Sequence, residues 1–256
     1  MNFVRLEKPD ISIVLPTFNE VHNVHPIIAE IEMAFASSEL KYEIIFVDDS
    51  TDETSVLVRN IMRSKPYVQL IHRAPEQRTG LGTAILEGMY AASADVVCSM
   101  DSDLQHPPQT ILKMFEAISA DDINFVVASR NVDEGSSEGL ANTFRHIVSD
   151  SSRLLASILL PLTRKTTDPM TGYFMLRKSL LKESTFTPIG FKLLVEILSR
   201  VPSIRSKDVP FIMRKREFGE SKATLKEGFR YLRLLTKLVI STPKHSILKY
   251  VYLPVY

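Results

Sequence analysis

The sequence predicts an α/β protein with a doubly wound, mostly parallel central sheet and flanking helices. Short apolar runs of strand length alternate with amphipathic stretches of helix length over roughly the first 130 residues. Most of these runs end in polar or charged residues, as strands do at the ligand-binding edge of such a sheet. With 256 residues and 45% apolar content, the chain is long enough to bury a full core.

The first two predicted strands, residues 11–15 and 42–47, both run into polar turns. Pro16-Thr17-Phe18-Asn19-Glu20 follows the first strand, and Asp48-Asp49-Ser50-Thr51-Asp52 follows the second. A helical pattern begins after each turn. The acids of the second turn are therefore candidates for ligand binding or, more simply, for capping the next helix through Ser50, Thr51 or Asp52.

A third strand, residues 68–71, is followed by Gly80 and Gly82 and then by a helix over residues 83–93. These glycines allow another group to approach the backbone closely. Their spacing matches neither a phosphate-binding P-loop nor a complete dinucleotide fingerprint.

The most informative stretch begins with a fourth strand from Val96. Asp101 and Asp103 follow it, and Pro107-Pro108 then opens a helical pattern at Gln109. Extended backbone would point both carboxylates to one side and Ser102 to the other. Two converging carboxylates, with Gln105 as a third oxygen ligand, suit Mg²⁺ or Mn²⁺. A solvated acidic turn is the competing interpretation.

The second half continues the pattern with a strand over residues 125–129 that ends at Arg130. A polar loop over 131–142 leads into a helix over 144–162, whose apolar stripe indicates core packing or a lipid contact. A strand ending at Leu176, a helix within 190–199 and a last strand over 209–213 complete the expected elements.

Positive charge gathers at the C-terminal end of the chain. Residues 201–256 hold twelve Lys or Arg against four Asp or Glu, although the whole chain carries a net charge of only +1. No overall field therefore favours nucleic acid as a partner. We expect a catalytic domain over 1–222 and a basic amphipathic, membrane-proximal segment over 223–256, which could instead be an ordinary surface helix.

Two further features bear on the cellular setting. The single Cys98 excludes an intramolecular disulfide, which fits a reducing compartment. The first ten residues are too charged for a signal peptide, and no apolar run reaches the ~18 residues of a membrane-spanning helix. These observations predict a soluble or peripheral protein.

In their order and spacing, these motifs resemble family 2 glycosyltransferases of the GT-A fold, and look closest to the dolichol-phosphate mannose synthases within them. The likeness spans residues 11–235. It rests on Pro16-Thr17-Phe18-Asn19-Glu20, Asp48-Asp49-Ser50, Gly80-Leu81-Gly82, Asp101-Ser102-Asp103-Leu104-Gln105-His106-Pro107-Pro108, Ser129-Arg130, Asp168-Pro169 and Arg216-Glu217-Phe218-Gly219-Glu220-Ser221-Lys222.

The resemblance implies a role for each matching residue. It makes Asp101, Asp103 and Arg216 catalytic, and Asp101, Asp103 and Gln105 the ligands of Mg²⁺ or Mn²⁺. The residues it assigns to the acceptor phosphate are Arg130, Arg145 and Ser149. Phe18 replaces a usual tyrosine, so one hydrogen bond near the base is in question. The residues assigned to the donor are Pro16, Thr17, Phe18, Glu20, Asp48, Asp49, Gly80, Asp101, Ser102, Asp103, Arg216 and Lys222.

The implied reaction is the inverting transfer of a hexose, most simply mannose from GDP-mannose, to a polyprenyl monophosphate such as dolichyl phosphate. A UDP-sugar donor of the glucose type is the alternative. The resemblance places the protein at the cytoplasmic face of a membrane, held there peripherally, by a membrane-anchoring subunit, or by a C-terminal transmembrane region outside this sequence.

Two other functions remain compatible with the residues alone. A metal-dependent phosphohydrolase could use Asp101, Asp103 and His106 at a strand end, although such enzymes normally have more His or carboxylate ligands. A non-catalytic module could bind a nucleotide or nucleotide sugar and regulate a membrane partner.

Overall fold

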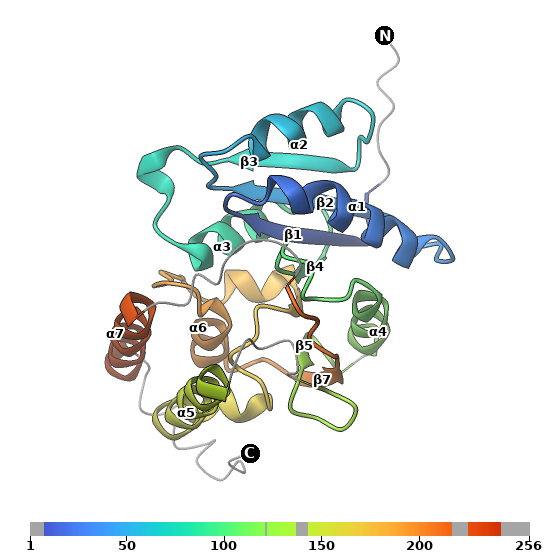
Figure 1. The fold of residues 1–256 in the computed structure, drawn as a ribbon. Helices are drawn as coiled ribbons and strands as arrows, with labels where there is room; N and C mark the ends of the chain where they lie inside the picture. Colours follow the sequence, from blue (N-terminus) through green and yellow to red (C-terminus); the bar gives the residue numbers. More distant parts are fainter. Residues whose placement is uncertain (1–7, 121, 137–142, 217–224, 242–256) are drawn as a thin grey trace.

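The computed structural model describes residues 8–120, 122–136, 143–216 and 225–241 (Figure 1). Its strands are β1 Ile11–Thr17, β2 Tyr42–Asp48, β3 Val68–His72, β4 Val96–Ser99, β5 Phe125–Ser129, β6 Phe174–Arg177 and β7 Ser206–Pro210. The α-helices are α1 Val21–Phe35, α2 Thr54–Met62, α3 Leu81–Ala91, α4 Gln109–Ile118, α5 Thr143–Leu159, α6 Leu193–Arg200 and α7 Leu225–Ser241. Short 3₁₀ helices occupy Pro75–Gln77, Pro161–Lys165 and Lys178–Lys182.

The described strands form one seven-stranded sheet in the order β3-β2-β1-β4-β6-β5-β7. All neighbouring pairs are parallel except those made by β6, which runs antiparallel to β4 and β5. The chain builds outward from β1 through β2 and β3 and then returns to place β4 on the other side of β1. This reversal creates a crevice between the carboxyl ends of β1 and β4, where open α/β sheets bind ligands. The predicted doubly wound, mostly parallel sheet is confirmed.

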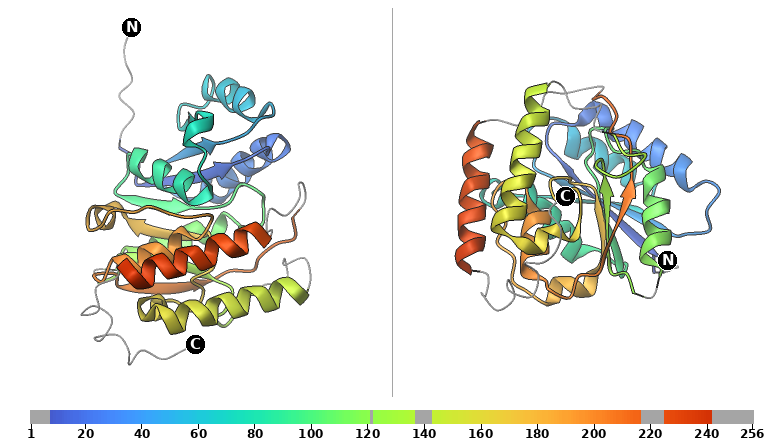
Figure 2. Two further views of the ribbon diagram at one scale, coloured as in Figure 1. Left: turned by 90° about the vertical axis from the view of Figure 1, so that its left-hand side faces the viewer. Right: turned by 90° about the horizontal axis from the view of Figure 1, so that it is seen from below.

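Helices cover both faces of the sheet. On one face, α1, α2 and α4 bury Ile27, Val58 and Met114 in one core with Ile13 of β1. On the other face, α3 and α6 pack against the opposite side chains of the same strands. The outermost helices, α5 and α7, lie side by side over α6 (Figure 2).

The last predicted strand is wrong in its position. An apolar run over 209–213 suggested a strand there, but β7 covers Ser206–Pro210 and pairs with β5. Because β7 is an edge strand with one partner, it needs no continuous apolar sequence. Phe211 instead lies beyond the strand, buried against His106 and Tyr173.

Helix α7 has two unlike faces. Its inner face buries Leu234, Leu235 and Leu238 in a small core with α5 and α6. Its outer face exposes Phe229 and Ile240. The expected division after residue 222 stays a prediction, but α7 is packed firmly onto the domain that precedes it.

Candidate active site

A cavity of about 490 Å³ opens at the carboxyl ends of β1 and β4. Eleven of the predicted site residues lie in its wall, brought together from five separate parts of the chain. They are Pro16, Thr17, Phe18, Glu20, Gly80, Asp101, Ser102, Asp103, Gln105, Arg130 and Arg216.

The two acids after β4 converge in a different way from the one predicted. Strand β4 ends at Ser99, so Asp101 and Asp103 lie in a turn rather than on extended backbone. Leu104 takes a left-handed conformation with φ 64°, and the Gln105 backbone N–H donates to Asp103 Oδ1 at 3.1 Å. The Ser102 hydroxyl donates to the Pro16 carbonyl at 3.0 Å, which ties this turn to the end of β1.

Arg216 lies directly against the acidic turn. Its Nη2 donates to Asp103 Oδ2 and, at 3.3 Å, to Gln105 Oε1. Asp103 Oδ2 and Gln105 Oε1 therefore face one common position, which the Arg216 guanidinium occupies. Burial raises the pKa of Asp101; His106 and Arg216 oppose this rise, and the charge of Asp103 adds to it.

This arrangement fits a hard divalent cation. The carboxylates of Asp101 and Asp103, which repel each other, and the amide oxygen of Gln105 supply the oxygen ligands that Mg²⁺ and Mn²⁺ prefer. A side chain at position 172 would fill the space beside them, because a Cβ on Gly172 would lie 3.1 Å from Asp101 Oδ1. No group of three His, Cys, Asp or Glu side chains gathers as a metal site within the described residues. Asp101, Asp103 and Gln105 would thus leave much of the coordination shell to a ligand.

His106 has a supporting role next to these acids. Its Nδ1 accepts the Asp101 backbone N–H at 3.1 Å, and its ring stacks on Tyr173 with a centroid separation of 4.7 Å. An Nδ1 that accepts a hydrogen bond from a backbone amide supports the turn. The other ring nitrogen, Nε2, lies 3.9 Å from Asp101 Oδ2. Within the described residues, His106 does not form a three-residue metal cluster with the two acids, as the phosphohydrolase interpretation would require.

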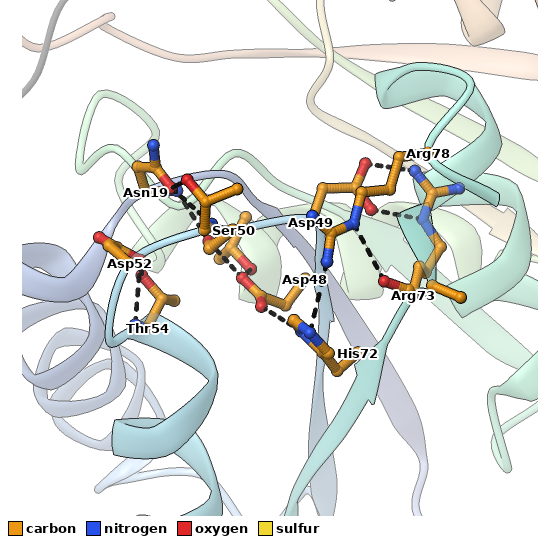
Figure 3. A network of polar contacts seen from close by, with 12 residues as sticks. Asn19, Asp48, Asp49, Ser50, Asp52, Thr54, His72, Arg73 and Arg78 are labelled. Atoms are coloured by element: carbon orange, nitrogen blue, oxygen red, sulfur yellow. Dashed lines mark hydrogen bonds and ion pairs between the residues drawn. The ribbon is translucent and has the colours of Figure 1, made fainter. Parts of the chain in front are cut away.

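Asp48 and Asp49, at the end of β2, are not part of the cavity wall and belong to a network of polar contacts (Figure 3). Asp48 is fully buried: Oδ1 accepts Thr17 Oγ1 at 2.9 Å and the Ser50 hydroxyl, and Oδ2 lies 2.7 Å from His72 Nδ1. Asp48 therefore supports Thr17, which lines the cavity, and its own contact with the donor stays a prediction.

Asp49 points to the other side of β2 and pairs with an arginine. The Arg73 Nε donates to Asp49 Oδ1 at 2.7 Å, and Arg73 Nη2 donates to Oδ2. Asp49 keeps some exposed surface, but it is not part of the cavity wall. Glu53 occupies the N-cap of α2 without a side-chain cap bond, and Asp52, one residue earlier, accepts the Thr54 N–H through Oδ1 at 3.0 Å. Asp52 thus serves the start of the helix from outside the N-cap position.

Arg130, also in the cavity wall, forms an ion pair with Asp168. Arg130 Nε and Nη2 donate to the two carboxylate oxygens at 2.7 and 2.9 Å. Burial alone would raise the pKa of Asp168, but hydrogen bonds and charge from Arg130 outweigh this effect and lower it. Arg145 and Ser149 lie on α5 with side chains outside the described part, and Lys222 also lies outside the described residues.

The glycines before α3 pack against a loop from the second half of the chain. Gly80 has φ 141°, and Cβ atoms at Gly80 and Gly82 would lie 3.2 and 3.1 Å from the Gly190 carbonyl oxygen. The Gly82 N–H donates to that oxygen at 2.9 Å. The sequence predicted that another group would approach the backbone at Gly80 and Gly82. In the structure that group is the backbone of Gly190, in the loop before α6.

Sequence reasoning missed three charged residues of the cavity wall: Lys192, Glu227 and Arg230. Glu227 and Arg230 lie on α7 and pair with each other. Lys192 immediately precedes α6, in a segment where only helical periodicity was noted. The one feature of the sequence that could have indicated Lys192 as a site residue is its position as a single lysine at the start of an apolar helix.

The comparisons with known proteins agree with the motifs. Residues 12–185 match the family described as glycosyl transferase family 2. A dolichol-phosphate mannosyltransferase from Pyrococcus furiosus is 36% identical over 90% of this chain, which spans 63% of that relative's length. One from Saccharomyces cerevisiae is 33% identical over 90% of this chain and 86% of its own length. The glucosyl-3-phosphoglycerate synthase of Mycobacterium tuberculosis, solved with Mn²⁺ and UDP-glucose, shares the fold with a TM-score of 0.68 at 21% identity, covering 91% of this chain and 79% of that one.

Proposed function

Because the chain belongs to glycosyl transferase family 2, we propose that it transfers a hexose from a nucleotide diphosphate sugar to a polyprenyl monophosphate. Mannose from GDP-mannose and dolichyl phosphate are the proposed pair, and the names of the relatives at 33–36% identity support them. One observation carries the proposal: a single cavity is lined by both an acidic turn that binds Arg216 and a second cation, Arg130.

The reaction moves negative charge across this cavity. A phosphate oxygen of the acceptor attacks the anomeric carbon, the bond from that carbon to the donor diphosphate breaks, and its electron pair leaves with the diphosphate. The acceptor phosphate therefore loses one negative charge and the leaving diphosphate gains one. A single displacement of this kind inverts the anomeric configuration and needs no enzyme nucleophile.

The residues have matching roles in this scheme. Arg216 donates to the charge that develops on the leaving diphosphate, as a positioned cation does in other displacements. A divalent cation held by Asp101, Asp103 and Gln105 would neutralise part of that charge. No general base is required, because a phosphate monoester is largely a dianion above its second pKa near 6.

The donor occupies the β1 side of the cavity in this proposal. Pro16, Thr17, Phe18 and Glu20 form the wall nearest the end of β1. The Phe18 side chain is 44% exposed, so its ring is accessible for stacking on a base. Asp49, Gly80 and, beyond the described residues, Lys222 remain proposed donor contacts.

The outer faces of α5 and α7 form the proposed membrane-facing surface. It consists of the exposed apolar residues Leu154, Ile158, Leu159, Phe229, Leu232, Val239 and Ile240. These side chains lie on two adjacent helices (Figure 2), and α7 also contributes Arg230 to the cavity wall. A lipid chain could therefore leave the cavity along α7 into a bilayer while its phosphate stays inside.

We place this surface against the cytoplasmic leaflet of a membrane. None of the described helices has the length and hydropathy needed to span a bilayer. A test is sedimentation with anionic liposomes: Phe229→Glu should reduce binding, because it puts a charge on the proposed contact. Equal binding by the wild type and this variant would refute the surface.

A donor and acceptor panel tests the reaction. Purified protein is incubated with GDP-mannose or UDP-glucose, a prenyl monophosphate, and Mg²⁺ or Mn²⁺, and the lipid-linked sugar is measured. We expect product from GDP-mannose that disappears when the metal is chelated. Release of inorganic phosphate without a sugar acceptor would favour a hydrolase, and nucleotide binding without turnover on any lipid phosphate would favour a binding module.

A further inference from the structure

Lys192 is a charged group of the cavity wall to which the proposed reaction has not yet assigned a role. We propose that its ammonium group binds the acceptor phosphate, beside Arg130. This inference rests on the proposed function, because it specifies how that function's acceptor is held.

The backbone sets the position of Lys192. The loop that carries it is pressed onto the start of α3 by the contact of Gly190 with Gly80 and Gly82. Gly190 itself has φ 69°, a conformation that favours glycine. Lys192 then directly precedes α6, whose apolar face is buried in the core. The tight packing of this loop thus fixes the position of Lys192 in the cavity wall.

The ammonium group keeps hydrogen-bonding capacity for a ligand. Its Nζ donates to the Met170 carbonyl at 2.7 Å and lies 4.5 Å from the centroid of the Phe191 ring. Within the described residues, Met170 is its one hydrogen-bond partner. Since a lysine can donate three hydrogen bonds, two remain for an incoming anion.

The carboxylates near Lys192 do not fully neutralise its charge. Burial lowers the pKa of Lys192 to about 8, and repulsion by Arg130 contributes, against the attraction of Asp168 and Asp101. Both acids have other commitments: Asp168 is held by Arg130, and Asp101 shares the acidic turn with Asp103. An anion placed between Lys192 and Arg130 would stabilise both cations.

The position favours the acceptor phosphate over the donor diphosphate. Lys192 Nζ is held by the carbonyl of Met170, two residues after the Asp168 that binds Arg130, so the ammonium group lies next to the turn that holds Arg130. Two of the Arg130 nitrogens already bind Asp168, so a further cation beside Arg130 would strengthen the binding of a dianion there. Because the acceptor loses charge as its new bond to the sugar forms, Lys192 should favour acceptor binding more than the transition state.

The experiment compares Lys192→Met, which removes the charge at similar length, with Lys192→Arg, which restores it. Lys178→Met is the matched control: Lys178 also donates to backbone carbonyls, at Tyr90 and Ala92, but lies outside the cavity wall. For each variant, KM for a short-chain prenyl monophosphate, kcat and the Kd for GDP-mannose are measured.

We expect Lys192→Met to raise the acceptor KM by about tenfold to a hundredfold, the usual effect of losing a hydrogen bond to a charged group. The donor Kd should stay within about twofold, and Lys192→Arg should recover most of the loss. An unchanged acceptor KM overturns the assignment. An equal weakening of donor binding also overturns it, because that result would indicate a general loss of cavity structure.

Calorimetry without turnover separates this inference from the proposed reaction. Binding of the prenyl monophosphate, with inorganic phosphate as a second probe, is measured for wild type and Lys192→Met. If the wild type binds the prenyl phosphate through Lys192 but transfers no sugar to it, the assignment stands and the proposed reaction fails. If the wild type transfers sugar and both proteins bind alike, the assignment alone fails.

Discussion

Two arginine–aspartate pairs face the same cavity, yet they differ in burial and in geometry. Arg130 and Asp168 have side chains that are 9% and 1% exposed and share two hydrogen bonds between the groups. The corresponding side chains of Arg216 and Asp103 are 26% and 9% exposed, and Arg216 uses the same nitrogen for Asp103 and Gln105.

The difference indicates that the first pair also stabilises the fold, whereas the second serves mainly the reaction. A buried two-bond pair is costly to break, because either partner alone would remain as an uncompensated charge. The Arg130–Asp168 pair therefore anchors the end of β5 to the turn before β6. Arg216 can exchange its partners at much lower cost, since solvent reaches its side chain. We expect substitutions in the first pair to change stability most and substitutions in the second to change activity most.

The largest expected effect on activity is that of Asp103→Asn. We expect transfer to fall by at least about a thousandfold, since the charge that faces both Arg216 and the proposed cation is lost. The amide oxygen can still accept the Gln105 N–H, so the thermal midpoint should hardly change. Initial rates of lipid-linked product and a thermal melt provide the two measurements. Full activity in this variant would defeat the metal assignment.

Asp168→Asn should have the largest effect on stability. Removing the charge leaves Arg130 buried without its counterion, which typically costs about 3–5 kcal/mol. Urea denaturation of wild type and variant gives the difference in the free energy of unfolding. A change below about 1 kcal/mol, as for a surface pair, would show that the two pairs do not differ in the way described.

Arg216→Met is expected to lower kcat by about a hundredfold while leaving the free energy of unfolding within about 1 kcal/mol. Arg214→Met is the control, because Arg214 pairs with Glu30 and its side chain is 42% exposed outside the cavity wall. Steady-state rates at saturating acceptor test both variants. An equal loss of kcat in the two variants would mean that the basic residues 214–216 act through their overall charge and not through the specific contacts of Arg216.

The smallest expected effect is a dependence on pH. Arg130 lowers the pKa of Asp168 in the folded protein, so this carboxylate stabilises the fold above its ordinary pKa. That contribution should disappear as the pH falls from about 4 through the lowered value. The difference in unfolding free energy between wild type and Asp168→Asn should therefore shrink on acidification. A constant difference between pH 7 and pH 3 would contradict the coupling.

The sequence itself determined much of the fold and one side of the site. Continuous apolar runs of strand length, most of them followed by a polar turn, are local patterns, and β5 was placed at its observed bounds. The acidic turn after β4 is contiguous, so Asp101, Asp103 and Gln105 could be read together. Gly80 and Gly82 likewise indicated that another group approaches the backbone there, although the sequence did not identify that group as the Gly190 loop.

Only the tertiary structure decided which of these groups meet a ligand and which support them. Asp48 and Asp49 are adjacent in sequence, but strand alternation and β3 bury one against His72 and pair the other with Arg73. Arg216 reaches Asp103 across 113 residues, and Lys192 reaches the cavity through a contact with glycines more than a hundred residues earlier. Local periodicity cannot encode such meetings, because they depend on how the packed sheet brings distant turns to one edge.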